Sequence, residues 1–86
     1  MKSKQPRHSA EETARRGDQL YEEKIRPQVE PENMGRVVAI DVDTGTFAVE
    51  DTALAASNQL FARRPDAEIW FLRVGDRALH RIGSAI

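Results

Sequence analysis

The chain has 86 residues, a formal net charge of −1 and no cysteine. This length allows one domain with a thin core, and the lack of cysteine excludes disulfides, thiolate metal sites and thiol nucleophiles. The near-zero net charge gives no long-range attraction to nucleic acid or to an anionic membrane. The longest apolar runs, Val37–Ile40 and Ile69–Leu72, are far shorter than the roughly 20 residues of a membrane span. We therefore expect a cytoplasmic protein without a membrane partner, in keeping with a reducing compartment.

The N-terminal part predicts a tail followed by a helix. Residues 1–8 are polar and basic with no apolar run, which indicates a disordered tail rather than a signal peptide. Ser9 and Glu12 form a capping box, so a helix is expected over residues 9–26, where Pro27 should end it. Its apolar stripe has helical spacing and consists of Ala10, Ala14, Gly17, Tyr21 and Ile25. The glycine in this stripe suggests a close approach to another part of the structure.

The region that follows this helix reads as a linker. Residues 27–35 contain Pro27 and Pro31 among polar and acidic residues, a composition that favours an extended connection. Such a linker leaves two alternatives open for the helix, which could pack on its own domain or on another molecule.

A β-hairpin is expected next. Residues 36–42 are rich in valine and isoleucine and predict a strand, and residues 46–50 alternate as a returning strand. Between them, Asp43-Thr44-Gly45 has turn chemistry, because aspartate favours the start of a turn and glycine accepts a positive φ. Gly45 is therefore expected at positive φ, with Asp43 exposed at the hairpin tip.

The second half predicts a helix and a further strand. Asp51 or Thr52 should cap a helix that ends at about residue 64, before Pro65. Residues 67–74 predict a third strand, whose apolar run Ile69–Leu72 suggests a central position in the sheet. Residues 77–82 fit either a short fourth strand or an irregular tail. The fold class is thus α+β: an N-terminal amphipathic helix, a linker and a two-layer ββαβ(β) domain over residues 36–86.

The strongest enzyme-like pattern is the segment around Asp43. Val42–Thr46 resembles the active-site motif of aspartic peptidases, in which two aspartates share a proton, but no second half of such a site follows it. Asp41 and Asp43 also resemble the nucleophile loop of haloacid-dehalogenase-like phosphatases, yet the chain has no lysine after Lys24. As a calcium loop the segment lacks a third acidic ligand and the flanking helices of an EF-hand. We therefore expect no enzyme activity, no cofactor and no metal.

The remaining polar candidates are histidines and arginines. His8 falls in the predicted tail, while His80 lies between Arg77 and Arg81, whose charges would repel a metal cation. A basic face is possible because arginine recognises phosphate well, and its candidate residues are Arg63, Arg64, Arg73, Arg77 and Arg81.

Several segments carry a resemblance to a known group. The run IRPQVEPE at Ile25–Glu32, followed by Gly35–Asp41, resembles a linker and strand in a group of small bacterial proteins of similar length and without an assigned activity. Arg63–Ala67 and Leu79–Gly83 resemble further signatures of this group. Residues 35–75 also look like a ββαβ module found beside small bacterial two-gene operons, which implies an antitoxin-like or adaptor role.

These observations predict a non-catalytic protein-binding module. Its partner is expected to be another protein or a second copy of the chain. The predicted contacts are on the first helix and near the C-terminus, at Ala14, Tyr21, Ile25, Arg77, His80 and Arg81. The alternative is a nucleic-acid-binding regulator that uses the C-terminal arginines.

Overall fold

A computed structural model describes residues 8–75 of the protein. A helical segment comes first, formed by α1 (Ala10–Leu20), η1 (Tyr21–Ile25) and α2 (Arg26–Val29). The strands β1 (Val37–Asp41) and β2 (Phe47–Glu50), the helix α3 (Ala53–Arg63) and the strand β3 (Ile69–Arg73) follow. No helix of the described range is long and apolar enough to cross a membrane.

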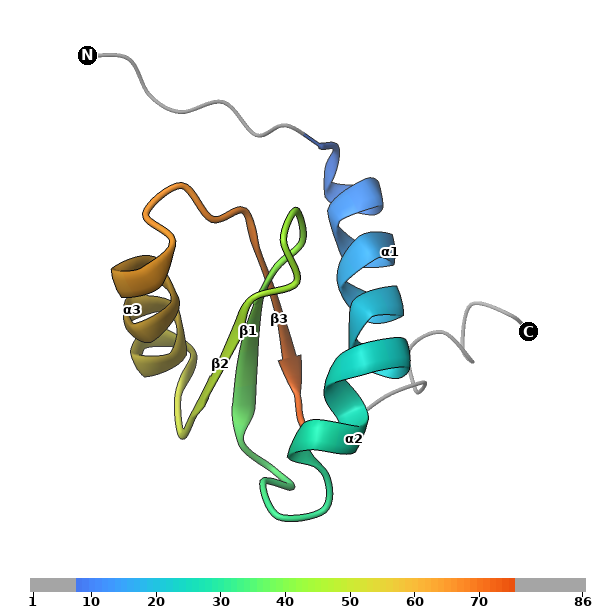
Figure 1. Ribbon diagram of the computed structural model, residues 1–86, viewed down its shortest axis with the longest axis vertical. Helices are drawn as coiled ribbons and strands as arrows, with labels where there is room; N and C mark the ends of the chain where they lie inside the picture. The colour runs from blue at the N-terminus through green and yellow to red at the C-terminus, as the bar shows by residue number, and fades with distance from the viewer. Residues whose placement is uncertain (1–7, 76–86) are drawn as a thin grey trace.

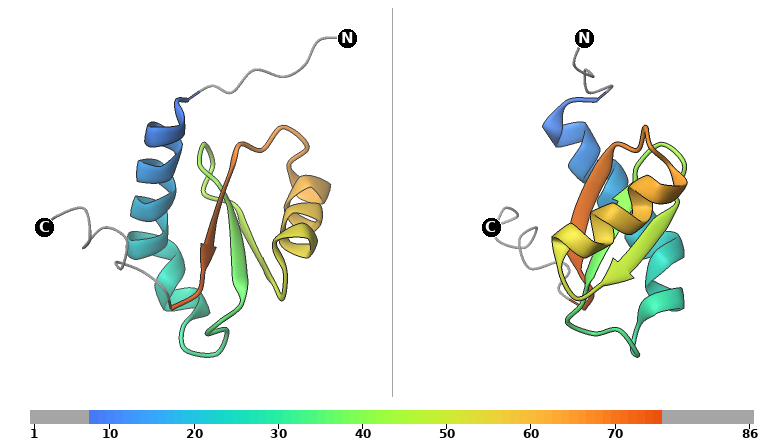
Figure 2. Two further views of the ribbon diagram at one scale, coloured as in Figure 1. Left: turned by 180° about the vertical axis from the view of Figure 1, so that it is seen from behind. Right: turned by 90° about the vertical axis from the view of Figure 1, so that its left-hand side faces the viewer.

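The three strands form one antiparallel sheet in the order β2-β1-β3. Both outer strands run antiparallel to β1, with Ala39 opposite Ala48 on one side and opposite Phe71 on the other. The chain therefore crosses from β2 to β3 over β1, through α3. In Figures 1 and 2 the sheet lies between α3 on one face and the N-terminal helical segment on the other.

The core has two parts because side chains alternate along β1. Val38 and Ile40 point to the N-terminal helical segment, where they join Tyr21, Ile25 and Val29. The other face carries a smaller cluster that α3 covers, made of Val37, Ala39, Ala48, Ala56 and Leu60. Each side of the sheet thus has its own core.

The predicted α+β class is confirmed: a helix precedes a ββαβ unit, and the N-terminal helical segment adds a third layer to it. Within residues 8–75, β1 is the central strand with all five of its residues buried, and β3 is an outer strand rather than the predicted central one. The run Ile69–Leu72 is apolar on both faces for a different reason. Trp70 and Leu72 face the N-terminal helical segment, whereas Ile69 packs in the cluster beneath α3.

The prediction that Pro27 ends the first helix was also wrong. Proline lacks an N–H group, and its ring clashes with the carbonyl four residues earlier in a regular α-helix. Here the turn before Pro27 widens to a π-helix, in which the Arg26 N–H donates to the Tyr21 carbonyl. The helix then continues to Val29.

The predicted linker is therefore shorter than residues 27–35 and is folded back on the domain. The Asn33 N–H donates to the Val29 carbonyl at 2.9 Å, and the Gly35 N–H donates to the Val74 carbonyl at 3.0 Å. The segment joins the end of the helix directly to the sheet. The predicted fourth strand, residues 77–82, lies outside the described residues.

Gly17 lies where α1 comes closest to β3. A Cβ atom built on Gly17 would overlap the Trp70 side chain, lying 2.7 Å from Trp70 Cβ and closer still to its ring. The indole Nε1 donates to Asp18 Oδ1 at 3.1 Å, which holds the ring against the helix. The close approach suggested by the sequence is thus a contact with a tryptophan side chain.

Replacing Gly17 with alanine should destabilise the protein. In an exposed helix the same change stabilises by up to about 1 kcal/mol, but here the added methyl group must displace Trp70, at a cost of about 1–3 kcal/mol. Chemical denaturation followed by tryptophan fluorescence measures the difference. Arg15→Ala, an exposed change on α1, is the control. Its free energy of unfolding should stay within about 0.5 kcal/mol of the wild-type value. A stabilised Gly17→Ala protein would contradict this packing.

Candidate functional site

The structure buries two residues that were predicted to contact a partner. Tyr21 and Ile25 lie in the protein's own core, with exposed fractions of 2% and 1%. Exposing side chains of this size costs roughly 1.5–3 kcal/mol each, a large part of the stability of a small domain. The prediction that they dock on a partner was therefore wrong for this fold. Ala14 is half-buried, and Arg77, His80 and Arg81 lie outside the described residues.

The hydroxyl of Tyr21 joins the helix to the ends of two other segments. It donates to Glu30 Oε2 at 2.6 Å and accepts from the Gly75 N–H at 3.3 Å. Burial, and secondly the hydrogen bond to the Glu30 carboxylate, favour the protonated hydroxyl and raise the pKa of Tyr21 to about 12. The tyrosine acts as a structural link.

A second polar arrangement surrounds the turn between β1 and β2. Gly45 has a φ of +84°, which confirms the predicted turn at Asp43-Thr44-Gly45. The turn is held by Asp41, whose exposed fraction is only 1%. Asp41 Oδ1 accepts from the Asp43 N–H at 3.0 Å, and Oδ2 accepts from the Thr44 hydroxyl at 2.9 Å. The buried carboxylate thus holds the turn from below, while Asp43 is exposed at the tip.

Asp41 also connects the turn to the segment between α3 and β3. Arg64 Nε donates to Asp41 Oδ2 at 3.4 Å, and the Glu68 N–H donates to Asp41 Oδ1, also at 3.4 Å. A buried carboxylate is stable only when hydrogen bonds and a positive charge compensate its lost hydration. Asp41 has both, so its contacts explain its place in the core without a catalytic role.

His8 brings the beginning of the described chain to the same turn. Its Nε2 lies 2.7 Å from Asp43 Oδ1, and its backbone N–H donates to Glu68 Oε2 at 3.2 Å. The Thr13 hydroxyl donates to the same Glu68 oxygen at 3.4 Å, and His8 Nδ1 lies 3.6 Å from Glu12 Oε1. The side chain of His8 is only 13% exposed. The prediction that His8 belongs to a disordered tail was therefore wrong.

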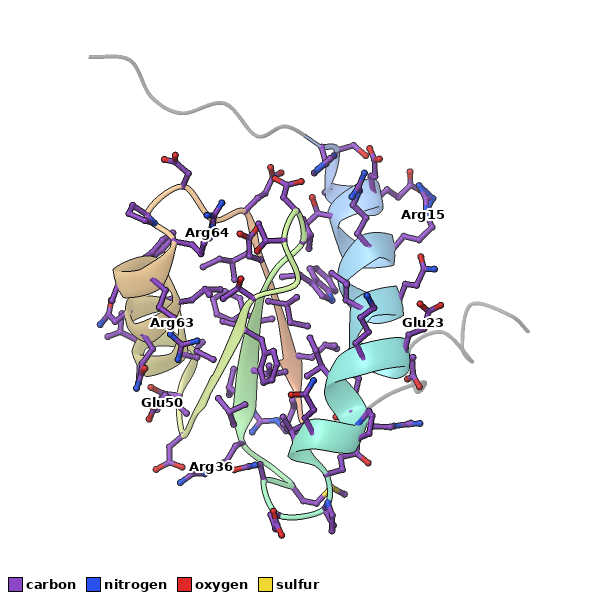
Figure 3. The ribbon with its side chains drawn as sticks, in the orientation of Figure 1. Arg15, Glu23, Arg36, Glu50, Arg63 and Arg64 are labelled. Atoms are coloured by element: carbon purple, nitrogen blue, oxygen red, sulfur yellow. The ribbon has the colours of Figure 1, made fainter. Side chains whose placement is uncertain are left out.

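The arginines of the described part do not gather on one face. Arg63 donates to the Phe47 carbonyl over β2, whereas Arg64 reaches Asp41 near the turn (Figure 3). Arg73 donates to the Gly35 carbonyl, at the opposite end of the sheet. Among residues 8–75, these three arginines thus serve separate acceptors at separate places.

Three large apolar side chains on the α3 side of the sheet are exposed: Leu54, Phe61 and Phe71. Their exposed fractions are 71%, 42% and 41%. Leu54 and Phe61 share one side of α3 because they are seven residues apart. The opposite side of α3 holds Gln59 and Arg63, which bond to β2. Phe71 lies on β3 and points to the same face of the sheet as its partner Ala39, which is the face that α3 covers at β1 and β2.

Within residues 8–75, the outer edge of β3 pairs with no other strand. Val42 donates to the Glu68 carbonyl and Val74 donates to the Arg36 carbonyl, so even-numbered residues of β3 are those bonded to β1. The N–H and C=O groups of odd-numbered residues, including Phe71, point away from the sheet. No strand within residues 8–75 pairs with them. An exposed ring and outward backbone groups thus occur at the same residue.

Sequence reasoning missed this surface and the contacts of His8. The chemistry-bearing residues around the turn, His8, Asp43 and Glu68, are 35 and 25 residues apart, so no local spacing connects them. Only the apolar run at Ile69–Leu72 carried a signal, because one of its faces had to remain poorly covered once β3 was an outer strand.

The ionisation of Tyr21 tests its burial directly. Tyr21 is the chain's one tyrosine, so the ultraviolet absorbance of tyrosinate reports it alone. Its pKa should be about 12 in the folded protein and about 10 in the unfolded chain. Since the raised pKa favours the protonated folded state, its contribution to stability is present below pH 10 and is lost as the pH rises towards 12. Tyr21→Phe should lack this loss, whereas an ordinary pKa in the folded protein would contradict the burial.

Replacing Asp41 with asparagine should destabilise the protein by about 1–3 kcal/mol. The amide group would place a donor against the Thr44 hydroxyl and Arg64, which now meet a carboxylate oxygen. Urea denaturation measures the loss. Asp51→Asn is the matched control, because Asp51 is 80% exposed in its ion pair with Arg36, and such pairs contribute at most about 1 kcal/mol. Equal losses in the two variants would argue against a structural role for Asp41.

Comparisons with known proteins add no relative: no family model, no curated protein and no solved structure matches the chain. The resemblance to a group of small bacterial proteins therefore stays a prediction.

Proposed function

We propose that the protein is a non-catalytic binding module that holds an extended segment of another protein against β3. The observation that carries this proposal is the outer edge of β3, which no strand of residues 8–75 pairs with, together with the exposed ring of Phe71 on that strand. Long apolar edge strands are usually blocked by charge, proline or a covering element, because they otherwise pair with other chains. On β3 the run Ile69–Leu72 contains no charged residue and no proline.

The chemistry of the edge indicates what a partner must supply. The outward N–H and C=O groups of β3 would bond to the backbone of an added strand, which gives affinity without demanding a sequence. Phe71 would contact apolar side chains at alternate positions of that strand, since successive residues of a strand point to opposite faces. We therefore infer an extended partner segment with apolar residues at every second position.

This proposal keeps the predicted class of function and changes the surface. The predicted helix contacts Tyr21 and Ile25 are buried, so the binding surface moves to the other side of the sheet. An antitoxin-like or adaptor role, and a location in the cytosol, are compatible with a small cysteine-free module of this kind. A second copy of the chain is the alternative partner, which the following experiment distinguishes.

Phe71→Glu should abolish partner binding and leave the fold intact. The tagged full-length chain is used to isolate a stoichiometric partner from native cells, and the affinity of each variant is then measured with the purified pair. We expect a loss of about thirtyfold or more, since a buried aromatic anchor contributes at least about 2 kcal/mol. The free protein should lose no more than about 1 kcal/mol, because the ring is already 41% exposed.

The control is Ala62→Glu, an exposed change on the outer side of α3, which should leave binding unchanged. Light scattering of the purified chain tests self-association, and a dimer that Phe71→Glu converts to a monomer would identify a second copy as the partner. Undiminished binding by Phe71→Glu would contradict the proposal. So would a large loss of stability in the free variant, because Phe71 would then be a core residue.

A further inference from the structure

Three potential metal ligands meet at the turn between β1 and β2. The imidazole of His8 and the carboxylates of Asp43 and Glu68 each offer one ligand atom, and these atoms all lie within 4.8 Å of one another. They come from three separate places: the residue before the cap of α1, the turn, and the residue before β3. The meeting therefore depends on the fold and is not a local run of acidic residues.

We propose that His8, Asp43 and Glu68 bind one divalent transition-metal ion. Ligand atoms around a tetrahedral ion lie about 3.4 Å apart when each bond is about 2.1 Å long. The observed separations bracket this value: His8 Nε2 lies 2.7 Å from Asp43 Oδ1, and all three ligand atoms lie within 4.8 Å of one another. The two carboxylates and the neutral imidazole together carry two negative charges, which offset the two positive charges of a divalent ion.

The surrounding residues resemble the outer shell of such sites. A metal-bound histidine donates its other ring N–H to a carboxylate or carbonyl, and His8 Nδ1 lies 3.6 Å from Glu12 Oε1 while Nε2 faces Asp43. Thr13 donates to Glu68 Oε2 and so orients that side chain. Beneath the turn, buried Asp41 holds the backbone that carries Asp43. Each proposed ligand is therefore positioned by a second group.

The ligand types select the class of ion. One imidazole nitrogen with two carboxylate oxygens suits Zn²⁺, Co²⁺ or Mn²⁺, whereas Mg²⁺ and Ca²⁺ prefer oxygen ligands alone. Without cysteine the chain cannot form a thiolate site. The inference is independent of the proposed function, because none of the three proposed ligands is a residue of β3.

Calorimetric titration of the metal-free full-length chain with Zn²⁺ tests the proposal. We expect one equivalent to bind, a higher unfolding temperature with Zn²⁺, and an affinity at least tenfold lower in His8→Gln. His80→Gln is the matched control, because His80 is the chain's other histidine, and it should bind Zn²⁺ like the wild type. In NMR spectra, Zn²⁺ should shift the imidazole signals of His8 and not those of His80.

Asp43→Asn provides a second variant that should fold, since Asp43 is exposed at the tip of the turn. It should also weaken Zn²⁺ binding at least tenfold. Three results would overturn the proposal: no Zn²⁺ binding, equal losses in the two histidine variants, or undiminished binding by His8→Gln. Competition by Mg²⁺ at concentrations similar to Zn²⁺ would do the same, because it would indicate carboxylate binding without the imidazole.

Discussion

The packing of the N-terminal helical segment on the sheet is the interaction on which the rest of the structure depends. Within residues 8–75 the sheet has three strands, and α3 covers one of its faces. Without the helical segment, Val38 and Ile40 would lie on an open face. Tyr21 and Ile25 close that face, and the Tyr21 hydroxyl links the helix to Glu30 and Gly75. In a domain this small, that face is a large share of the core.

This packing also decides which surfaces remain for function. A helix whose apolar residues complete the core cannot leave to bind a partner without unfolding much of the domain. The two proposed sites therefore lie elsewhere. One is the outer edge of β3 with Phe71, and the other is the turn where His8 meets Asp43. They use different residues and can be tested separately.

The turn at Asp43-Thr44-Gly45 shows how one short motif can have several uses. Gly45 permits the backbone geometry, and Asp41 stabilises it from the core. Neither role involves the chemistry of the aspartic peptidases, whose active-site motif this segment resembles. The exposed Asp43 carboxylate at the tip is available to meet His8, a residue 35 positions away. The buried Asp41 thus has a structural role, and the exposed Asp43 has the proposed role of a metal ligand.

The sequence by itself determined the element types, because their signals are local. The Ser9 side-chain cap, the turn at Gly45 and the cap at Thr52 each act within a few residues, and all three are observed. The α+β class followed from the order of these elements. The effect of Pro27 did not follow, because tertiary packing of Ile25 and Val29 favours a widened turn over the end of the helix.

Only the tertiary structure decided the strand order, the partner of the first helix and the candidate sites. An apolar run can have the same composition in a central strand and in an outer strand that helices partly cover. The run Ile69–Leu72 therefore could not show the position of β3 in the strand order. An amphipathic helix likewise does not encode whether its apolar side meets its own sheet or another molecule. The meeting of His8, Asp43 and Glu68 depends on long-range chain folding, which no spacing along the sequence records.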